Sequence, residues 1–404
     1  MKLYEKILIF FFILASLGLY QLRGLGIVVR LLDIFTVGFI LIAYIVYAFW
    51  DPNKERLKAG FRWPIILLLV GVFISSVAAE VFHDQSLHLT FYQQRHMYAF
   101  LFYFLLIYMA PKPDWLIDVL FYFGVIGGLF FLAQYFLYPT LITDAKIFLG
   151  RGTIRMNLPG TYYMHIAFFL SVDRFFTTYE KKYGLGMVLL LLVAFLSAFR
   201  STIASYALIT TGFILLNTKV RNKVLLFGLY GLLVVAGGFA FSTILMEMKT
   251  SAERETSQGS SYIRVRAAGY FFSKNEEHKV TYIIGNGEPT ERSPYGRKLA
   301  VLSFMSGFYL SDVGIIGFYF KYGLMAALVM LFVMFKIIFT RLNRKVFFIK
   351  LFFLFHLLLI LIAKTSFEFL DSIIAVCMML YLFDYYASSQ ESDPIVITPE
   401  KKIS

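Results

Sequence analysis

The sequence predicts an all-α polytopic membrane protein of about twelve transmembrane helices with one large polar segment. Of its 404 residues 59% are hydrophobic, 19% are aromatic and only 16% are charged. A mean hydropathy of +0.72 is far from that of a soluble domain, which needs a polar surface. We therefore expect a single integral membrane domain over residues 1–404, embedded in a lipid bilayer.

Apolar runs of membrane-spanning length, about 16 to 25 residues, recur along the whole chain. In order they cover residues 5–21, 27–49, 63–82, 97–110, 115–138, 161–177, 184–199, 201–216, 224–245, 311–338, 346–363 and 367–386. The fourth run is short for a full span, and the seventh and eighth are separated only by a tight turn at Arg200. The first run leads into further spans and lacks a small-residue cleavage site, so we expect no cleaved signal peptide.

Lysines and arginines in the short connecting segments set the expected orientation. They cluster after the second, sixth, eighth and tenth runs, at residues 54–62, 181–182, 219–223 and 341–345. The positive-inside rule places these segments in the cytoplasm, together with both termini and the polar tail 388–404. The segment 246–310 then lies outside as a large extracytoplasmic loop. Its basic residues do not oppose this placement, because long loops translocate largely regardless of charge.

Composition also argues against several classes of function. The single cysteine, Cys377, has no disulfide partner, and the six histidines show no metal-ligand spacing, so we expect no metal and no cofactor. The net charge of +13 is spread between apolar runs and does not form one soluble basic face, which argues against a nucleic-acid partner. The sequence contains no Gly-rich Walker loop for a nucleotide.

The predicted external side collects many arginines. They are Arg254, Arg264, Arg266, Arg292 and Arg297 in the large loop, Arg151 and Arg155 in the segment 139–160, and Arg200 at a helix junction. Small residues before Arg264 and Arg266 would let backbone and guanidinium groups approach a phosphate together. Taken alone, Arg200 fits equally well a residue that snorkels to the bilayer interface. For Arg151 and Arg155 the sequence alone favours a solvated loop.

Such a cluster suits a transferase that uses a lipid-linked donor. Activated nucleotide sugars are cytoplasmic, so an external transferase needs a sugar carried on a lipid pyrophosphate. Fixed guanidinium groups stabilise the charge that develops on the departing pyrophosphate without a metal ion. Asp312 and His165 are candidates for the base that the acceptor hydroxyl needs. The alternative roles are a helix N-cap for Asp312 and packing or an interhelical hydrogen bond for His165.

Three short segments resemble the O-antigen polymerase and O-antigen ligase superfamily. They are Leu196-Ser197-Ala198-Phe199-Arg200-Ser201-Thr202, Gly259-Ser260-Ser261-Tyr262-Ile263-Arg264 and Tyr309-Leu310-Ser311-Asp312-Val313-Gly314-Ile315-Ile316-Gly317, and with the topology the likeness covers residues 60–385. The resemblance implies a Wzy-type polymerase of the bacterial inner membrane, similar in fold to the class C membrane glycosyltransferases, with its active site facing the periplasm. It also implies donor and acceptor glycans linked to undecaprenyl pyrophosphate, and a co-polymerase that regulates chain length.

The resemblance assigns pyrophosphate or sugar-phosphate binding to Arg200 and Arg264. The other substrate-binding candidates are Arg266, Arg254, Arg151, Arg155, Arg292 and Tyr262, and Tyr262 lies within the second of these motifs. Two further patterns have structural interpretations. Lys364 and Glu368 have the spacing of a helical ion pair, and Gly285-Asn286-Gly287 has the composition of a turn.

Two other functions remain open at this point. A ligase that transfers finished glycan to a lipid core or to protein shares the donor chemistry, but ligases of the superfamily carry a histidine about nine residues before the acid of the third motif. Residues 302–307 contain no histidine, which favours the polymerase. A flippase for lipid-linked oligosaccharides would also have about twelve spans, but the sequence shows no internal repeat and few charges at mid-membrane depth. A structural scaffold would explain neither the external arginines nor the loop.

Overall fold

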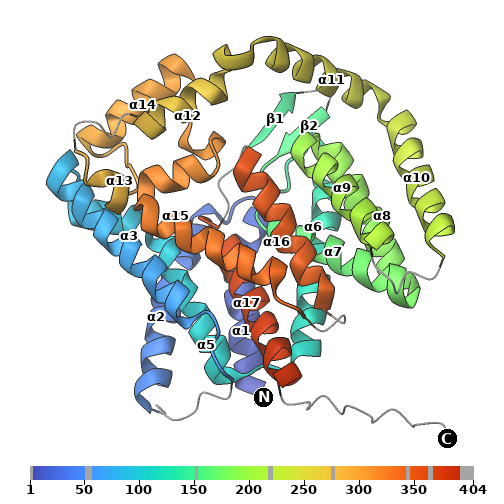
Figure 1. Ribbon diagram of the computed structural model, residues 1–404, viewed down its shortest axis with the longest axis horizontal. Helices are drawn as coiled ribbons and strands as arrows, with labels where there is room; N and C mark the ends of the chain where they lie inside the picture. Colours follow the sequence, from blue (N-terminus) through green and yellow to red (C-terminus); the bar gives the residue numbers. More distant parts are fainter. Residues whose placement is uncertain are drawn as a thin grey trace, which may run out of the picture.

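The fold is almost entirely helical (Figure 1). The computed structural model describes residues 3–50, 57–150, 153–216, 222–273, 278–342, 346–362 and 367–391. The first half contains α1 (Leu3–Ser16), the 3-10 helix η1 (Gly18–Gln21), α2 (Gly26–Trp50), α3 (Arg62–His83), α4 (Leu87–Gln93), η2 (Arg95–Leu101), α5 (Phe102–Met109) and α6 (Pro113–Leu137). A hairpin of β1 (Ile147–Gly150) and β2 (Thr153–Met156) follows.

The second half is again helical. It contains α7 (Thr161–Thr178), α8 (Lys181–Ser197), α9 (Arg200–Leu216), α10 (Lys223–Ala240), α11 (Ser242–Ser257), η3 (Gly259–Ser261), α12 (Ile263–Ser273), α13 (Thr281–Ile284), α14 (Pro294–Ser306), η5 (Leu310–Asp312), α15 (Ile315–Phe339), α16 (Phe347–Ile362) and α17 (Leu370–Glu391). The short hairpin is the departure from the predicted all-α class.

The apolar helices identify a polytopic membrane protein. Among the described residues, the helices long and apolar enough to cross a membrane are Leu3–Gln21, Gly26–Phe49, Arg62–His83, Pro113–Leu137, Ile315–Phe339 and Leu370–Ser388, six in all. A seventh crossing results if α10 and α11 count as one broken span. The other predicted runs also coincide with helices, but these are shorter or less apolar. The all-α membrane class is therefore confirmed, whereas the count of twelve spans stays a prediction.

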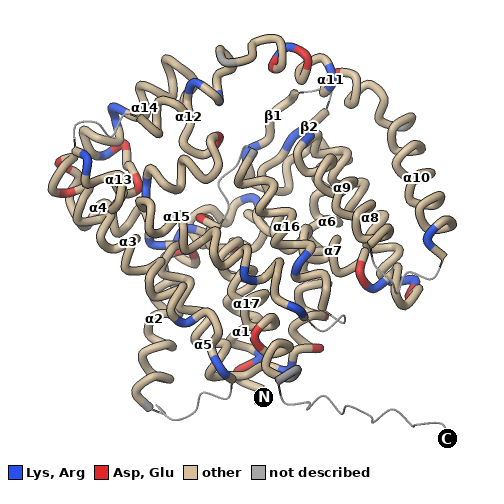
Figure 2. Tube along the Cα trace, viewed as in Figure 1, with Lys and Arg blue, Asp and Glu red and all other residues tan. Residues whose placement is uncertain are grey.

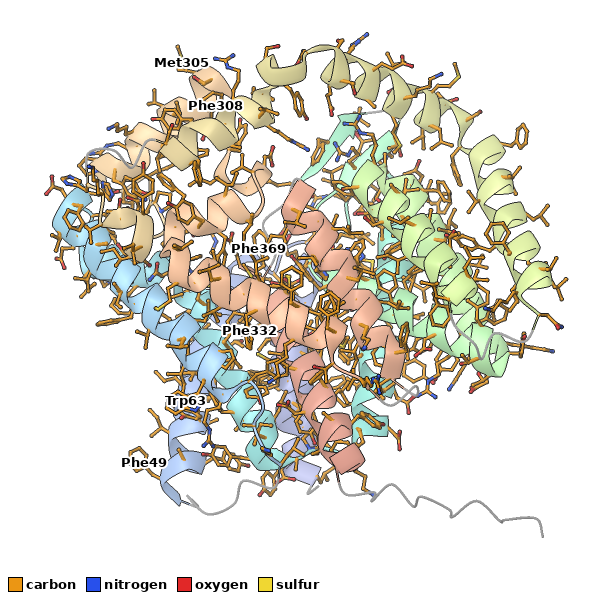
Figure 3. All side chains as sticks on the ribbon, viewed as in Figure 1. Phe49, Trp63, Met305, Phe308, Phe332 and Phe369 are labelled. Atoms are coloured by element: carbon orange, nitrogen blue, oxygen red, sulfur yellow. The ribbon has the colours of Figure 1, made fainter. Side chains whose placement is uncertain are left out.

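The exposed apolar side chains match a lipid environment. Helix α17 is the centre of the bundle and is largely buried, whereas α2 is mostly exposed despite its high hydropathy. Phe49 and Trp63 project outward from the lower ends of α2 and α3, with exposures of 83% and 70% (Figure 3). Apolar residues can remain this exposed where the surrounding solvent is hydrocarbon.

The segment predicted as a large loop is built of helices. The predicted span 224–245 is wrong at its end, because α10 stops at Ala240 and the chain turns by 85° into α11. Helix α11 then arches over the upper edge of the molecule towards α12 and α14 (Figure 1). Figure 2 shows charged residues along α11, α12 and α14, whereas the middle parts of α3 and α10 carry none. The upper edge is therefore the polar rim of an apolar bundle.

Two further boundaries differ from the prediction. The predicted helix 311–338 begins at Ile315 and is broken at Gly323, whose φ of 83° lies in the left-handed region. The predicted tail 388–404 begins inside α17, which continues to Glu391, and the rest of the tail lies outside the described residues. The start of α1 and the end of α17 lie at the same lower edge of the molecule (Figure 1).

Candidate active site

Arg200 joins the first turn of α9 to the arching helix α11. Helix α8 ends at Ser197 because Ala198 takes a left-handed conformation with φ of 51°, and α9 begins two residues later at Arg200. The Arg200 guanidinium forms an ion pair with Glu255 and donates a hydrogen bond from Nη1 to the Met248 carbonyl oxygen at 3.3 Å. Its side chain is 22% exposed. Arg200 is thus held by α11 and reaches the polar rim.

Tyr262 and Arg264 come close to Arg200 through the same glutamate. The Tyr262 hydroxyl lies close to the Glu255 carboxylate. Burial raises the pKa of Tyr262, and the positive charges of Arg264 and Arg200 oppose that rise. Two of the predicted motifs, 196–202 and 259–264, therefore meet at Glu255, a residue that the sequence analysis did not select.

Arg264 and Arg266 diverge, although the sequence suggested one joint anion site. Both lie in the first turn of α12, but positions two apart on a helix face different directions. Arg264 is half-buried, whereas Arg266 is exposed and its Cζ lies 5.7 Å from the centre of the Phe308 ring in the turn after α14. Gly259 has φ of 50° and open space beside its Cα, which leaves the turn before α12 uncrowded.

The β-hairpin places Arg155 beside Arg200. The Arg155 Cζ lies 4.5 Å from the centre of the Phe199 ring and 5.1 Å from that of Phe148, its cross-strand partner. Thr153 fixes β2 by donating a hydrogen bond of 3.0 Å to the Leu196 carbonyl oxygen at the end of α8. Arg151, the other arginine predicted in this segment, lies outside the described residues.

His165 lines a small pocket directly below this rim. The pocket contains about 450 Å³ of empty space, part of it open to solvent, and Phe199 and Thr202 on either side of Arg200 contribute to its wall. His165 is buried near the start of α7, and its Nδ1 lies 2.6 Å from the Tyr206 hydroxyl oxygen. The predicted interhelical hydrogen bond is present, since Tyr206 belongs to α9. The other walls are mostly apolar side chains of α6, α7 and α8.

Asp312, Arg254 and Arg292, all within the described part of the chain, make no side-chain hydrogen bond or ion pair with Arg200 or Glu255. Asp312 is half-buried in η5, where its Oδ1 accepts a hydrogen bond from Ser311 Oγ at 3.4 Å. The N-cap interpretation of Asp312 is wrong, because α15 begins after Gly314. Arg254 and Arg292 are exposed, and neither forms an ion pair with any residue that the structure describes.

The sequence analysis missed a buried ionic cluster at the break in α15. Lys321, with 4% of its side chain exposed, places Nζ 3.0 Å from Glu288 Oε2 and 2.6 Å from Glu368 Oε2. The Tyr322 hydroxyl donates a 3.0 Å hydrogen bond to the same oxygen of Glu288. A lysine inside a predicted span was the available signal, because an ionisable residue at membrane depth is normally paired and functional.

Lys364 and Glu368 were predicted to form an ion pair within one helix, but Glu368 is not in a helix. Glu368 precedes α17 and pairs with Lys321, and Lys364 lies outside the described residues. The prediction of a turn at 285–287 is wrong, because the structure has no turn at these residues. The backbone nitrogen of Gly287 donates to the Lys321 carbonyl oxygen at 2.8 Å, and Gly285 has φ of 81°. This segment therefore lies along the break in α15.

The described residues contain no group of three or more His, Cys, Asp or Glu side chains arranged to hold a metal ion. Arg155 lies against Phe199, Arg200 pairs with Glu255, and the charge of Arg264 acts on Tyr262. Such an arrangement of positive groups can bind a dianionic group and stabilise charge on it. Comparisons with protein-family models, with curated proteins and with solved structures gave no significant match.

Proposed function

We propose that the protein is a polymerase that joins oligosaccharide repeat units carried on undecaprenyl pyrophosphate into a surface polysaccharide such as O-antigen. The proposal rests chiefly on one observation. Arg200 and the Tyr262–Arg264 segment, which are distant in the sequence, converge on Glu255 at the polar rim of an apolar helical bundle. A cluster of guanidinium groups at the edge of a membrane-embedded bundle fits a substrate with a lipid tail and an anionic pyrophosphate.

The proposed reaction is a glycosyl transfer. The acceptor hydroxyl oxygen attacks the anomeric carbon of the growing chain, the bond from that carbon to the pyrophosphate oxygen breaks, and undecaprenyl pyrophosphate leaves. Arg200 and Arg264 stabilise the charge on the leaving oxygen, a role in which one lost donor typically costs about 10²–10³ in rate. No metal ion or other cofactor takes part. Arg155, Arg266, Arg254, Arg151, Arg292 and Tyr262 form the proposed wider substrate-binding set.

The base that accepts the hydroxyl proton is assigned to one of two residues. His165 borders the pocket that Phe199 and Thr202 share with the rim, so a hydroxyl in that pocket would lie near the leaving group. Asp312 is the second candidate and lies at the entry to α15. His165 is favoured by its position beside this pocket.

The proposal also sets the cellular context. The polar rim would face the periplasm and both termini the cytoplasm, in a bacterial inner membrane. Donor and acceptor would both be lipid-linked, a co-polymerase would control chain length, and nucleic acid would have no role. Few ionisable residues at mid-membrane depth still argue against a flippase, although the Lys321 cluster is an exception.

The test is a defined reaction with the purified protein in detergent. Repeat units on undecaprenyl pyrophosphate are supplied without nucleotide sugar, and products are separated by size. A ladder spaced by one repeat unit supports the polymerase. A single transfer onto an added core-lipid acceptor would identify a ligase instead, and translocation in vesicles without any transfer would identify a carrier.

A further inference from the structure

Glu255 forms an ion pair with the guanidinium group of Arg200, which the proposed function requires for binding its substrate. Its carboxylate forms the ion pair with Arg200 and lies close to the Tyr262 hydroxyl, and its side chain is 32% exposed. A carboxylate and a phosphate use the same two-pronged contact with a guanidinium group. A pyrophosphate can therefore reach Arg200 fully only after Glu255 has moved.

Helix α11 is anchored in a way that permits this movement. Its first half is fixed by Ile244 and Met248, which are buried against Ala198 between α8 and α9. Its second half, after Met248, has no fully buried residue. The Arg200–Glu255 ion pair joins that second half to α9, so breaking the pair leaves it without its main described attachment.

The cost of exchange is small enough for a substrate to supply. Partly exposed ion pairs contribute little to stability, because solvent competes for both charges. A pyrophosphate carries more charge than one carboxylate. It would also be attracted by Arg155, which lies against the Phe199 ring next to Arg200 in the sequence, and by Arg264, whose charge acts on Tyr262. The interaction of pyrophosphate with Arg200 is therefore more favourable than the interaction with Glu255 that it replaces.

We infer that Glu255 is an internal competitor that keeps Arg200 neutralised until a pyrophosphate displaces it, and that the displacement releases the second half of α11 from α9. The inference rests on the proposed function and adds its regulation. Without substrate, Glu255 prevents other anions from binding to Arg200. Binding of the donor pyrophosphate frees the second half of α11 above the site. By mass action, the apparent affinity for pyrophosphate is reduced by the fraction of molecules in which Glu255 holds Arg200.

The experiment compares variants that remove one carboxylate from the same helix. Glu255→Gln removes the competitor, and Glu253→Gln is the matched control because Glu253 is exposed and contacts only Lys249, at 3.8 Å, in a surface pair. Binding of inorganic pyrophosphate and of farnesyl pyrophosphate to the full chain in detergent is measured by calorimetry. We expect Glu255→Gln to bind inorganic pyrophosphate about threefold to fivefold more tightly, Glu253→Gln to match the wild type, and Arg200→Gln to abolish the difference.

A second measurement needs no substitution. In the wild-type protein, saturating pyrophosphate should increase amide hydrogen exchange in residues 249–257 and leave 242–248 unchanged. Unchanged or weaker binding by Glu255→Gln, or greater protection of 249–257, would overturn the inference. A stronger response to farnesyl pyrophosphate than to inorganic pyrophosphate identifies the lipid-linked form as the ligand.

The outcomes separate this inference from the proposed function. If Glu255→Gln binds pyrophosphate more tightly but lipid-linked repeat units give no ladder, the regulation stands and the polymerase assignment fails. If the wild type makes the ladder and Glu255→Gln shows no gain in affinity, the polymerase stands and Glu255 is not a competitor.

Discussion

Replacing Lys321 with methionine should destabilise the protein strongly. The lysine ammonium group lies between the carboxylates of Glu288 and Glu368, at 3.0 and 2.6 Å, and only 4% of its side chain is exposed. Its removal leaves two carboxylates facing each other in the interior of the bundle. Loss of one partner from a buried ion pair costs about 3–5 kcal/mol, because the remaining charge is neither solvated nor paired.

Thermal unfolding in detergent provides the assay. The chain has one cysteine, Cys377, which is fully buried in α17, so a thiol-reactive dye reports exposure of the core. Lys321→Met should lower the unfolding temperature by many degrees. The triple variant that adds Glu288→Gln and Glu368→Gln should recover most of the loss, because it leaves no unpaired charge. Unfolding of Lys321→Met at the wild-type temperature would refute the assignment of this cluster as a structural ion pair.

Two further predictions concern the rim and the break in α15. Arg200→Ala and Arg264→Ala should leave the protein inserted but lower the initial rate of polymer formation by about 10²–10³, whereas Lys298→Ala, at an exposed position on α14, should not. Either arginine variant with wild-type rates would exclude that residue from the site. Gly285→Ala should destabilise by more than about 1–2 kcal/mol, because its φ is 81° and a Cβ would lie 2.4 Å from the Lys321 carbonyl oxygen. In the same thiol assay Gly212→Ala, whose added Cβ would meet no atom within 4 Å, should unfold no earlier than the wild type, and equal behaviour of the two variants would contradict the close approach.

The membrane class and the positions of the helices follow from local sequence. Every predicted apolar run overlaps a helix, because hydropathy and helix-forming potential are properties of neighbouring residues. The tight turn before Arg200 was also predictable, since two apolar runs stop there on either side of a polar residue. The hairpin of β1 and β2 was not, because strands of four residues leave too short a pattern to recognise.

The residues that form the site were harder to predict from the sequence. Arg200, Tyr262 and Arg264 were identified from short motifs, and they lie together, but Glu255 between them belongs to a helix with no distinguishing pattern. The partners of Lys321 come from segments on either side of it in the sequence. Glu288 comes near only because the segment 285–287 forms backbone hydrogen bonds with the break in α15. Such long-range pairings depend on tertiary structure, so a single sequence does not reveal them.

The bend between α10 and α11 illustrates the same limit. Residues 224–245 form one apolar run, and hydropathy alone predicts one continuous span. The chain instead turns at Phe241, where Ile244 and Met248 pack against Ala198. Packing against α8 and α9 therefore determines where α11 leaves the bundle.

The most direct test of the account counts the leaving group. Purified protein is incubated with lipid-linked repeat units in the presence of a metal chelator and without nucleotide sugar, and released undecaprenyl pyrophosphate is quantified against the number of new glycosidic linkages. The account predicts one undecaprenyl pyrophosphate for each linkage, with full activity in chelator. Linkages formed without release of that lipid, or no linkages until a metal ion or nucleotide sugar is added, would contradict it.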